Sequence, residues 1–315
     1  MTYINQIVDF ISTFTNNGQD KENTVLAISL PLYVITIGLE MLFSHLEGRN
    51  FYSVKETLTN VYLTTLNMLC DLGMRILVAV FCLGFAYNHR IFSFEKNAFY
   101  WIGLVLAIDF MYYWLHRADH YCRVFWAVHV THHSSTHYNI TTGFRSSVFE
   151  PMYRFLFYMP IAFLGFSVLD IIFIHSALQI YGVFVHTQYV KRLPKILEFF
   201  LVSPAHHRVH HGSNIEYLDK NMAMTFIIWD RIFGTFQDEL EEIPVVYGLT
   251  TNPEDRGPVN IVFHEWIIIW QDVTQKGLTL KERLGYLFQP PGWSHDGSRM
   301  TSVQLRKAKY ENINE

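Results

Sequence analysis

Long apolar runs separated by short polar stretches dominate the pattern of the chain. Residues 25–43 form a run of 19 with a single carboxylate, and residues 61–87 and 98–115 form two more runs of 18 or more. About 20 consecutive apolar residues cross a bilayer as a helix. Each run is therefore predicted to be a membrane helix, because a soluble helical core rarely needs three of this length. The second run carries Asp71 and Arg75, which would share a helix face and pair.

The composition agrees with a membrane protein. Only 17% of the residues are charged, against about 25% in an ordinary soluble domain. The net charge of -4 provides no general attraction for nucleic acid. The three cysteines lie among apolar neighbours and form no paired framework, which also excludes a secreted domain built on disulfides.

Histidine is the outlier, with 16 residues, six of them between positions 116 and 137. Three clusters have helical spacing, and residues three and four apart lie on one side of a helix. The clusters are His116 with His120, His129 with His132 and His133, and His207 with His210 and His211. Imidazole is the commonest metal ligand among side chains, and eight clustered rings are too many for one ion but suit two. The clusters therefore predict a two-metal site.

Two of the clusters can be placed on predicted elements. The first begins directly after the third apolar run, so the metals would lie just outside the hydrocarbon, at the mouth of the bundle. The third has the signals of a short helix of its own. Ser203 can cap this helix, Pro204 fits its first position and Gly212 fits its end.

The three clusters can meet only if they lie on the same side of the membrane. Residues 155–185, between the second and third clusters, must then cross an even number of times. They are predicted to form a hairpin of two helices broken near Asp170, or a pair that does not span. The second alternative is open because 15 helical residues reach about 22 Å, whereas the hydrocarbon core is about 30 Å thick. Basic residues on the cluster side indicate that this side is cytoplasmic.

These elements predict an all-α integral membrane bundle of about four to five membrane-embedded helices with a cytoplasmic, histidine-rich cap. Residues 1–23 form an N-terminal segment, and 24–187 form the membrane part with the first two clusters. Residues 188–275 form the cap with the third cluster, and 276–315 form a polar tail. Within the cap, residues 259–270 are too short to span and are expected to lie as a helix at the membrane interface.

Spacing alone does not name the metal. Zinc would favour hydrolysis and iron would favour the activation of O2, and the clusters lack the Glu-x-x-His pattern of soluble di-iron carboxylate bundles. A histidine-rich metal transporter is a non-enzyme alternative, although a transporter would place its ligands near the membrane midplane. The chain contains no haem-attachment motif, flavin fingerprint or glycine-rich dinucleotide loop. An oxidative enzyme of this sequence would therefore need a separate reductant.

The pattern HxxxH, HxxHH, HxxHH resembles the fatty acid hydroxylase and sterol desaturase superfamily of membrane di-iron oxygenases. The sequence around the clusters resembles that family too, at residues 129–135, 203–214 and 228–236. Residues 246–250 and 291–293 resemble the alkylglycerol monooxygenase branch in particular. The resemblance therefore indicates oxygen chemistry on a lipid.

The resemblance implies two ferrous ions that use O2 to hydroxylate or desaturate a lipid, in a bacterial inner membrane or the endoplasmic reticulum. In the alkylglycerol branch, tetrahydrobiopterin supplies the electrons and the carbon beside an ether oxygen is hydroxylated, which yields an aldehyde and glycerol. In the sterol and fatty acyl branches, electrons come through cytochrome b5-like or ferredoxin-like partners. The eight clustered histidines match the family's metal ligands. His186 is the candidate for a ninth ligand, and an extra histidine found one turn earlier in some relatives is Gly182 here.

Asp109 lies seven residues before His116 on the same helix face. A carboxylate inside a membrane is expensive and usually functional. Asp109 is predicted to assist catalysis by orienting a ligand imidazole through its free N–H; the alternative is a pair with a tyrosine hydroxyl or with Arg75. Asn139 is a weaker catalytic candidate of the same kind, as is Asp230.

Two further histidines are not assigned to the metals. His206 is adjacent to a predicted ligand, and it either supports that ligand or is exposed. His137 lies where the family has no ligand, and it is predicted to be structural.

Overall fold

The computed structural model describes residues 19–74 and 81–313, and these residues form helices and no β-strand. The long helices are α2 (Gln19–Leu46), α3 (Val54–Met74), α5 (Ala98–Tyr121) and α8 (Val168–Phe184). The shorter elements are α4 (Gly84–Asn88), α6 (Arg123–His133), η3 (Ile140–Phe144), η4 (Glu150–Met152), α7 (Arg154–Leu164), α9 (Lys195–Phe200), α10 (Pro204–His210), α11 (Ile228–Phe233), α12 (Asn260–Val273), α13 (Leu280–Phe288) and α14 (Ser302–Ile313). The all-α prediction is confirmed for the described residues.

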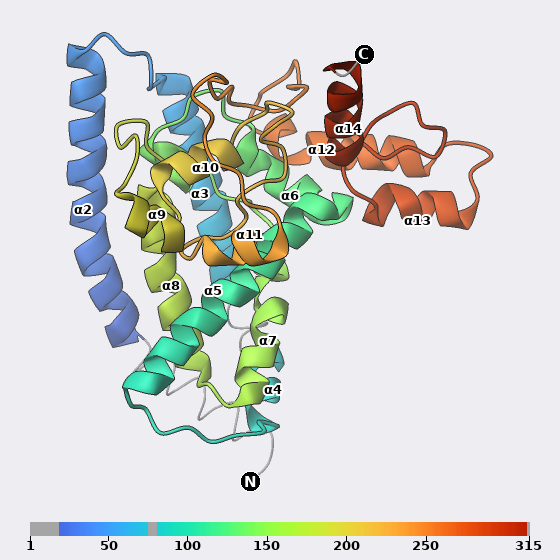
Figure 1. The fold of residues 1–315 in the computed structure, drawn as a ribbon. Helices are drawn as coiled ribbons and strands as arrows, with labels where there is room; N and C mark the ends of the chain where they lie inside the picture. Colours follow the sequence, from blue (N-terminus) through green and yellow to red (C-terminus); the bar gives the residue numbers. More distant parts are fainter. Residues whose placement is uncertain (1–18, 75–80, 314–315) are drawn as a thin grey trace.

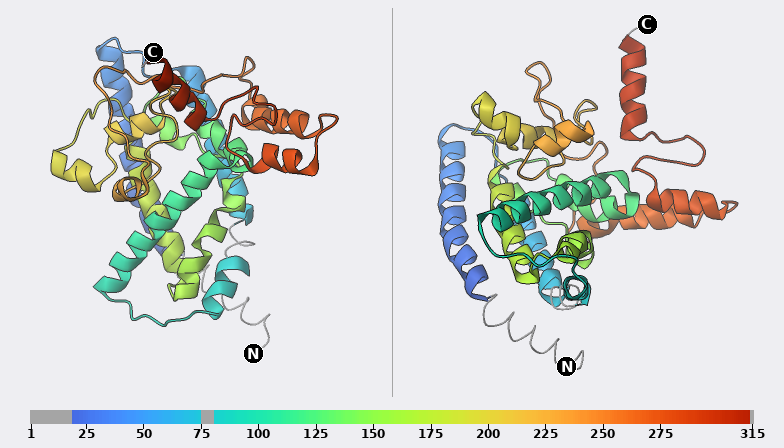
Figure 2. Two further views of the ribbon diagram at one scale, coloured as in Figure 1. Left: turned by 45° about the vertical axis from the view of Figure 1, so that its right-hand side comes forward. Right: turned by 60° about the horizontal axis from the view of Figure 1, so that its bottom comes forward.

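The long helices form a bundle, and most of the short helices of the second half of the chain gather at one end of it (Figure 1). α5 crosses the bundle obliquely and leads into α6 at that end. α12 and α13 project together from one side, as the further views in Figure 2 also show. The stretch predicted as a polar tail thus contains two helices, α13 and α14.

Two helices are long and apolar enough to cross a membrane, Ala27–Leu46 within α2 and Ala98–Tyr121, which is α5. The outer face of α2 exposes large apolar side chains, and Leu30, Val34 and Leu46 are 63–68% exposed. An apolar surface of this extent marks a contact with lipid or another apolar partner. Two of the three predicted spans therefore satisfy the length and composition of a membrane helix.

The second predicted span is described only in part. α3 ends at Met74, and Arg75 of the predicted pair lies outside the described residues. The buried carboxylate of Asp71 accepts a hydrogen bond from Arg154 Nη2 of α7 at 2.5 Å. This ion pair fastens α3 to the following hairpin.

The expected hairpin between the second and third histidine clusters is present as α7 and α8. The break lies at Gly165, not near Asp170, which is in the first turn of α8. Gly165 has a φ of +119°, and a Cβ there would lie 2.2 Å from the carbonyl oxygen of Phe92. Only glycine combines this left-handed backbone with so close an approach, and its position sets the end of α7.

The apolar core of the bundle lies where α5 meets this hairpin. Leu104 and Ile108 of α5 are fully buried, as are Tyr158 of α7 and Ile171 of α8. A fully buried aliphatic side chain contributes about 1.5–3 kcal/mol relative to an exposed one. This packing fixes the direction of α5, the helix that carries the first histidine cluster.

A buried arginine joins the bundle to the end that carries the histidines. The Arg145 side chain is 0% exposed. It donates to Glu56 Oε2 (3.1 Å) and Asn60 Oδ1 (2.9 Å) of α3, and to the carbonyl oxygen of Thr131 (2.8 Å) and Ser134 Oγ (2.8 Å) around the end of α6. Burial lowers the pKa of Arg145 to about 10, so the guanidinium remains charged at neutral pH. Each of the three guanidinium nitrogens of Arg145 donates to at least one partner, as a buried cation requires.

Replacing Arg145 with Met should lower the free energy of unfolding by about 1–3 kcal/mol, because Asn60 and Ser134 lose a buried donor and Glu56 keeps only Arg256 as a charged partner. Thermal unfolding in detergent measures the change. Arg90→Met is the matched control, since Arg90 is exposed and its loss should change stability by no more than about 0.5 kcal/mol. Equal melting temperatures for the two variants would show that Arg145 does not join the bundle to the end that carries the histidines.

Candidate metal centre

Four chain segments bring the predicted histidines together. α5 carries His116 and His120 in its last two turns, and α6 carries the second cluster. The extended backbone of Cys122, with φ −129° and ψ 120°, separates α5 from α6. α10 carries the third cluster, with His211 as its C-cap, and His186 follows directly after α8.

The local structure of α10 follows the predicted signals. Ser203 is the N-cap and accepts a hydrogen bond from the His206 backbone N–H (3.3 Å), and Pro204 is the first helical residue. His206 completes the capping box, because its Nδ1 accepts from the Ser203 backbone N–H (3.2 Å). The ring of His206 is fully buried, so it holds the start of the helix and is not exposed. His137 lies outside both histidine groups.

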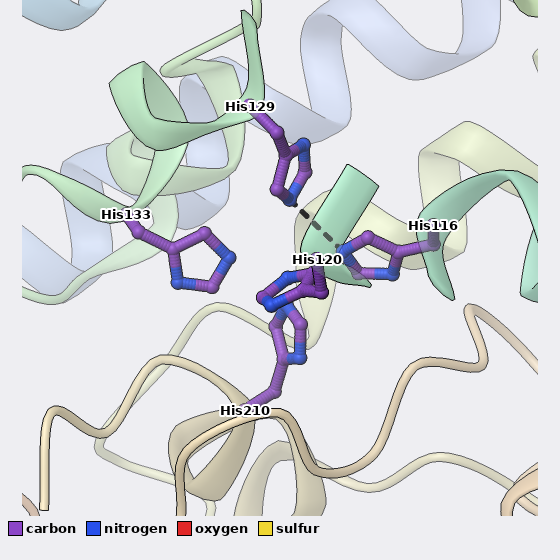
Figure 3. Close-up of side chains that lie close together, drawn as sticks. All are labelled: His116, His120, His129, His133 and His210. Carbon is purple, nitrogen blue, oxygen red and sulfur yellow. Dashed lines mark hydrogen bonds between the residues drawn. The ribbon is translucent and has the colours of Figure 1, made fainter. Parts of the chain in front are cut away.

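The nine predicted ligands form two groups, in each of which one nitrogen from every ring lies within 4.8 Å of the others. Group one comprises His116, His120, His129, His133 and His210, and Figure 3 shows these five rings around a common centre. Group two comprises His132, His186, His207 and His211. The rings of His133 and His211 are stacked with centroids 4.5 Å apart, so the two groups are adjacent.

Helical spacing explains how each triplet divides. In the second cluster the i, i+4 pair His129 and His133 belongs to group one, while His132 belongs to group two. In the third cluster the i, i+4 pair His207 and His211 belongs to group two, while His210 belongs to group one. Residues four apart share a direction more closely than neighbours do. One HxxHH segment can therefore supply ligands to both groups from about one turn of helix.

Outward hydrogen bonds fix the orientation of several rings. Nδ1 donates to a backbone carbonyl in His116 (Met222, 2.7 Å), His132 (Arg145, 2.9 Å), His186 (Gly182, 2.7 Å) and His210 (Lys220, 2.9 Å). A carbonyl can only accept, so Nδ1 carries the proton and Nε2 presents its lone pair to the interior. This is the arrangement in which an imidazole binds a metal.

The inward nitrogens have the spacing of ligands on a common ion. His116 Nε2 and His129 Nε2 are 3.0 Å apart, and His186 Nε2 lies 2.9 Å from His207 Nε2 and 3.1 Å from His211 Nε2. Two nitrogens bound at about 2.0–2.1 Å to one metal and at right angles lie about 3 Å apart. The buried Nε2 atoms of His120, His133 and His210 have no hydrogen-bond partner. The nine residues therefore fit two metal ions.

Burial also favours the neutral form of seven of the rings. Desolvation, together with the neighbouring imidazoles, lowers the pKa of six ligands outside the membrane helices well below the usual value, and lowers that of His132 to about 4. Metal binding requires the neutral ring, so no proton has to leave at pH 7. Neither group includes a carboxylate among the described residues, and imidazole donors suit iron, zinc, copper or nickel.

The carbonyls that hold His116 and His210 belong to the non-helical segment 219–226, which two buried carboxylates organise. Asp109 of α5 accepts from the backbone N–H groups of Thr225 (2.9 Å) and Phe226 (3.0 Å) and from Trp229 Nε1 (2.9 Å). Asp230 accepts from the N–H groups of Met222 (2.7 Å) and Ala223 (2.8 Å) and from Thr235 Oγ1 (2.6 Å). These contacts place both carbonyls opposite the rings.

The two residues predicted to be catalytic lie away from the inward nitrogens. The carboxylate of Asp109 accepts its hydrogen bonds from segment 219–226 and from Trp229, and not from an imidazole. Asn139 caps η3 by accepting from the Thr141 N–H (3.0 Å), and its amide donates to the Phe51 carbonyl (2.6 Å). Both residues position the backbone. Asp109 was predicted to contact a ligand imidazole. It instead binds the backbone segment whose Met222 carbonyl holds His116.

Sequence reasoning missed two carboxylates that approach ligand rings from behind. Asp219 Oδ1 accepts from His120 Nδ1 (3.2 Å), and its other oxygen accepts from Ser302 at the start of α14. Asp119 Oδ2 lies 3.8 Å from His129 Nδ1. Asp119 is adjacent to a cluster histidine in the sequence, and that proximity was the available signal.

Asp109→Leu should weaken metal binding by about 10–100-fold, the usual cost of losing an outer partner of a metal ligand. Without this carboxylate, segment 219–226 no longer holds the Met222 carbonyl against His116. Metal per chain after dialysis against graded chelator measures the effect. Asp255→Asn, at an exposed position, is the control and should retain the parent metal content. Full retention by Asp109→Leu would contradict the positioning role.

A family model described as fatty acid hydroxylase matches residues 101–235, the region that holds both histidine groups. The chain is 34% identical over 274 residues to alkylglycerol monooxygenase of Homo sapiens, which is 86% of this chain and 60% of that protein. It is 32% identical over 290 residues to the Xenopus tropicalis alkylglycerol monooxygenase, which is 91% of this chain and 64% of that protein.

The similarity to other relatives is shorter. The chain is 30% identical over 156 residues to lathosterol oxidase of Mus musculus, which is 44% of this chain and 47% of that protein. No solved structure matches the chain. The chain spans about three fifths of the length of the human and frog alkylglycerol monooxygenases. The family model and the relatives agree over the histidine region, and residues 101–235 form a domain of the fatty acid hydroxylase family.

Proposed function

We propose that this protein is a membrane-bound monooxygenase that holds two iron ions and hydroxylates a lipid with O2 and an external reductant. The observation that carries the proposal is the convergence of nine imidazoles, eight of them buried, into two adjacent groups at the end of a candidate membrane helix. Alkylglycerol ether lipids are the proposed substrates, because similarity to alkylglycerol monooxygenases covers 86–91% of the chain in the human and frog relatives.

Each histidine group would hold one ferrous ion. Bound iron would supply the activation of O2, from which one oxygen atom enters a C–H bond of the lipid and the other leaves as water at the cost of two electrons. The protein contributes orientation. The carbonyls of Met222, Lys220 and Arg145 hold three rings by their Nδ1 protons, so their Nε2 lone pairs stay directed inward.

The electrons must come from outside the chain, because the sequence holds no haem, flavin or dinucleotide motif. A tetrahydropterin such as tetrahydrobiopterin is the proposed donor. An electron-transfer protein is the alternative if the enzyme is a sterol or fatty acyl hydroxylase or desaturase. The shorter similarity to lathosterol oxidases favours that second candidate, and product analysis separates the two.

The proposed membrane arrangement places the three histidine clusters on one face of the bilayer. Residues 24–187 contain the membrane helices, including the hairpin of α7 and α8, and residues 188–275 form the cap. Residues 1–23 and 276–315 flank these parts. Basic residues on the cluster side favour the cytoplasmic face of the endoplasmic reticulum or of a bacterial inner membrane. This geometry argues against a metal transporter, because the clusters begin in the last turns of α5 and not at its middle.

Turnover of an alkylglycerol that is labelled in its alkyl group, by the purified protein, tests the proposal. With O2 and a tetrahydropterin, we expect a labelled aldehyde, consumption of O2 and about two iron ions per chain. Without the pterin, the aldehyde should be absent. Iron-loaded protein that consumes no O2 with ether lipid, sterol or fatty acyl substrates under any reductant would overturn the enzyme assignment. Activity that zinc restores after iron removal would identify a hydrolase instead.

His132→Ala should remove a ligand of group two and lower bound iron towards one ion per chain, while the protein stays inserted in the membrane. Turnover should fall by at least about 100-fold, more than the loss of an outer partner costs. His137→Ala is the matched control, since this nearby histidine lies outside both groups, and it should retain near-parent activity. Full turnover in His132→Ala would refute the ligand assignment. Membrane fractionation and elemental analysis of both variants complete the comparison.

A further inference from the structure

The last helix of the described chain, α14, lies at the end of the molecule that carries the histidines (Figure 1). It belongs to the stretch predicted as a polar tail, and it lies outside residues 101–235, which the family model matches. A contact between α14 and the metal centre would therefore come from outside the matched domain.

Three side chains on one face of α14 bind the segment 216–219. The three pairs are Ser302 Oγ with Asp219 Oδ2, Arg306 Nη1 with the Leu218 carbonyl oxygen (2.6 Å), and Lys309 Nζ with Glu216 Oε1. Positions 302, 306 and 309 follow one another at intervals of four and three residues, so they share one side of the helix. α14 is therefore fastened to this segment over about two turns of its length.

Contacts elsewhere fix the position at which α14 begins. The Thr301 N–H donates to Gln304 Oε1 (2.8 Å), and Thr301 Oγ1 accepts from the Gln304 N–H (3.4 Å), which is a reciprocal cap of the helix start. Just before this cap, Arg299 Nη2 contacts Asp272 Oδ1 of α12 at 2.6 Å. The start of α14 is thus held independently of the segment that the helix contacts.

Asp219 has a backbone conformation that depends on its surroundings. Its φ is +52°, a left-handed value that is unfavourable for most residues other than glycine, although aspartate tolerates it better than others do. Such a conformation persists only where neighbouring contacts determine it. α14 supplies contacts on both sides of this position, because Arg306 binds the carbonyl of Leu218 and Ser302 binds the Asp219 carboxylate.

The Asp219 carboxylate is the outer partner of a ligand ring. Its Oδ1 accepts from His120 Nδ1 (3.2 Å), and the opposite nitrogen of this group-one ring, Nε2, is buried without a hydrogen-bond partner. Four other ligand rings are held by backbone carbonyls instead. A side-chain carboxylate can rotate, so keeping one oxygen on the ring requires a partner for the other oxygen. Ser302 is that partner.

We propose that Ser302 is a positioning residue of the metal centre, which holds the Asp219 carboxylate and thereby keeps His120 Nε2 directed at group one. The inference rests on the metal centre of the proposed function, and it adds a support for one ligand from outside the matched domain. A carboxylate behind an imidazole fixes the orientation of the ring and raises its basicity as a ligand. Loss of the serine hydroxyl should therefore weaken metal binding although no ligand is removed.

Competition for Zn²⁺ between the metal-free full-length protein and a chelator of known affinity tests this role. Zn²⁺ suits imidazole donors and activates no O2, so the result does not depend on turnover. Ser302→Ala should lower the affinity for Zn²⁺ by about 3–10-fold, which corresponds to one hydrogen bond. Asp219→Ala should lower it by about 10–100-fold, the usual effect of losing the outer partner of a ligand. Ser302→Thr keeps the hydroxyl and should match the parent, as should the control Ser298→Ala at a nearby exposed position.

A double-mutant cycle separates positioning from a general loss of structure. In protein that already carries His120→Ala, Asp219 has no ring to hold, so adding Ser302→Ala should lower the Zn²⁺ affinity no further. An equal loss in both backgrounds would contradict the inference, because Ser302 would then act on the fold and not through His120. Parent affinity in Ser302→Ala, or weakened binding in Ser302→Thr, would contradict it too. A parent protein that binds no Zn²⁺ would overturn the metal centre itself and this inference with it.

Discussion

The convergence of nine imidazoles in two adjacent groups is the constraint on which the rest of the molecule depends. Ring nitrogens that lie 2.9–3.1 Å apart must share a proton or oppose their lone pairs unless a cation lies between them, and removing them from water adds to that cost. Four rings are held from outside by carbonyls, which leaves the inner nitrogens free to bind. Metal binding therefore contributes directly to the free energy that stabilises this end of the fold.

Much of the site could be predicted from the sequence because helical spacing is a local property. The triplets 129–133 and 207–211 and the cap at Ser203 all depend on residues within one turn, and the structure forms the helices they indicate. The division of each triplet between two groups depends on how α6 and α10 meet. That packing joins residues about 80 positions apart, and no local pattern encodes it.

The polar contacts that hold the ligand rings were harder to predict, because every residue has a backbone carbonyl and the sequence does not indicate which ones face a ring. Asp109 was expected to touch a ligand ring, yet its bonds reach segment 219–226, which then presents its carbonyls to the rings. Asn139 was a weaker candidate of the same kind, and its side chain caps η3 and donates to the Phe51 carbonyl. The buried Arg145 fork likewise joins α3 to the end of α6 through contacts more than 80 residues apart. For Asp109 and Asn139 the sequence drew attention to the polar residue but not to the group that it contacts, and Arg145 did not stand out at all.

The interleaving of the two histidine groups has a consequence for how they fill. His132 and His133 are neighbours on one helix, as are His210 and His211 on another, yet each pair divides between the groups. Ordering either turn around one ion places the donors for the other at the same time, so the conformational cost is met only once. In the proposed two-ion enzyme, binding of the first ion should accordingly raise the affinity of the other group for the second.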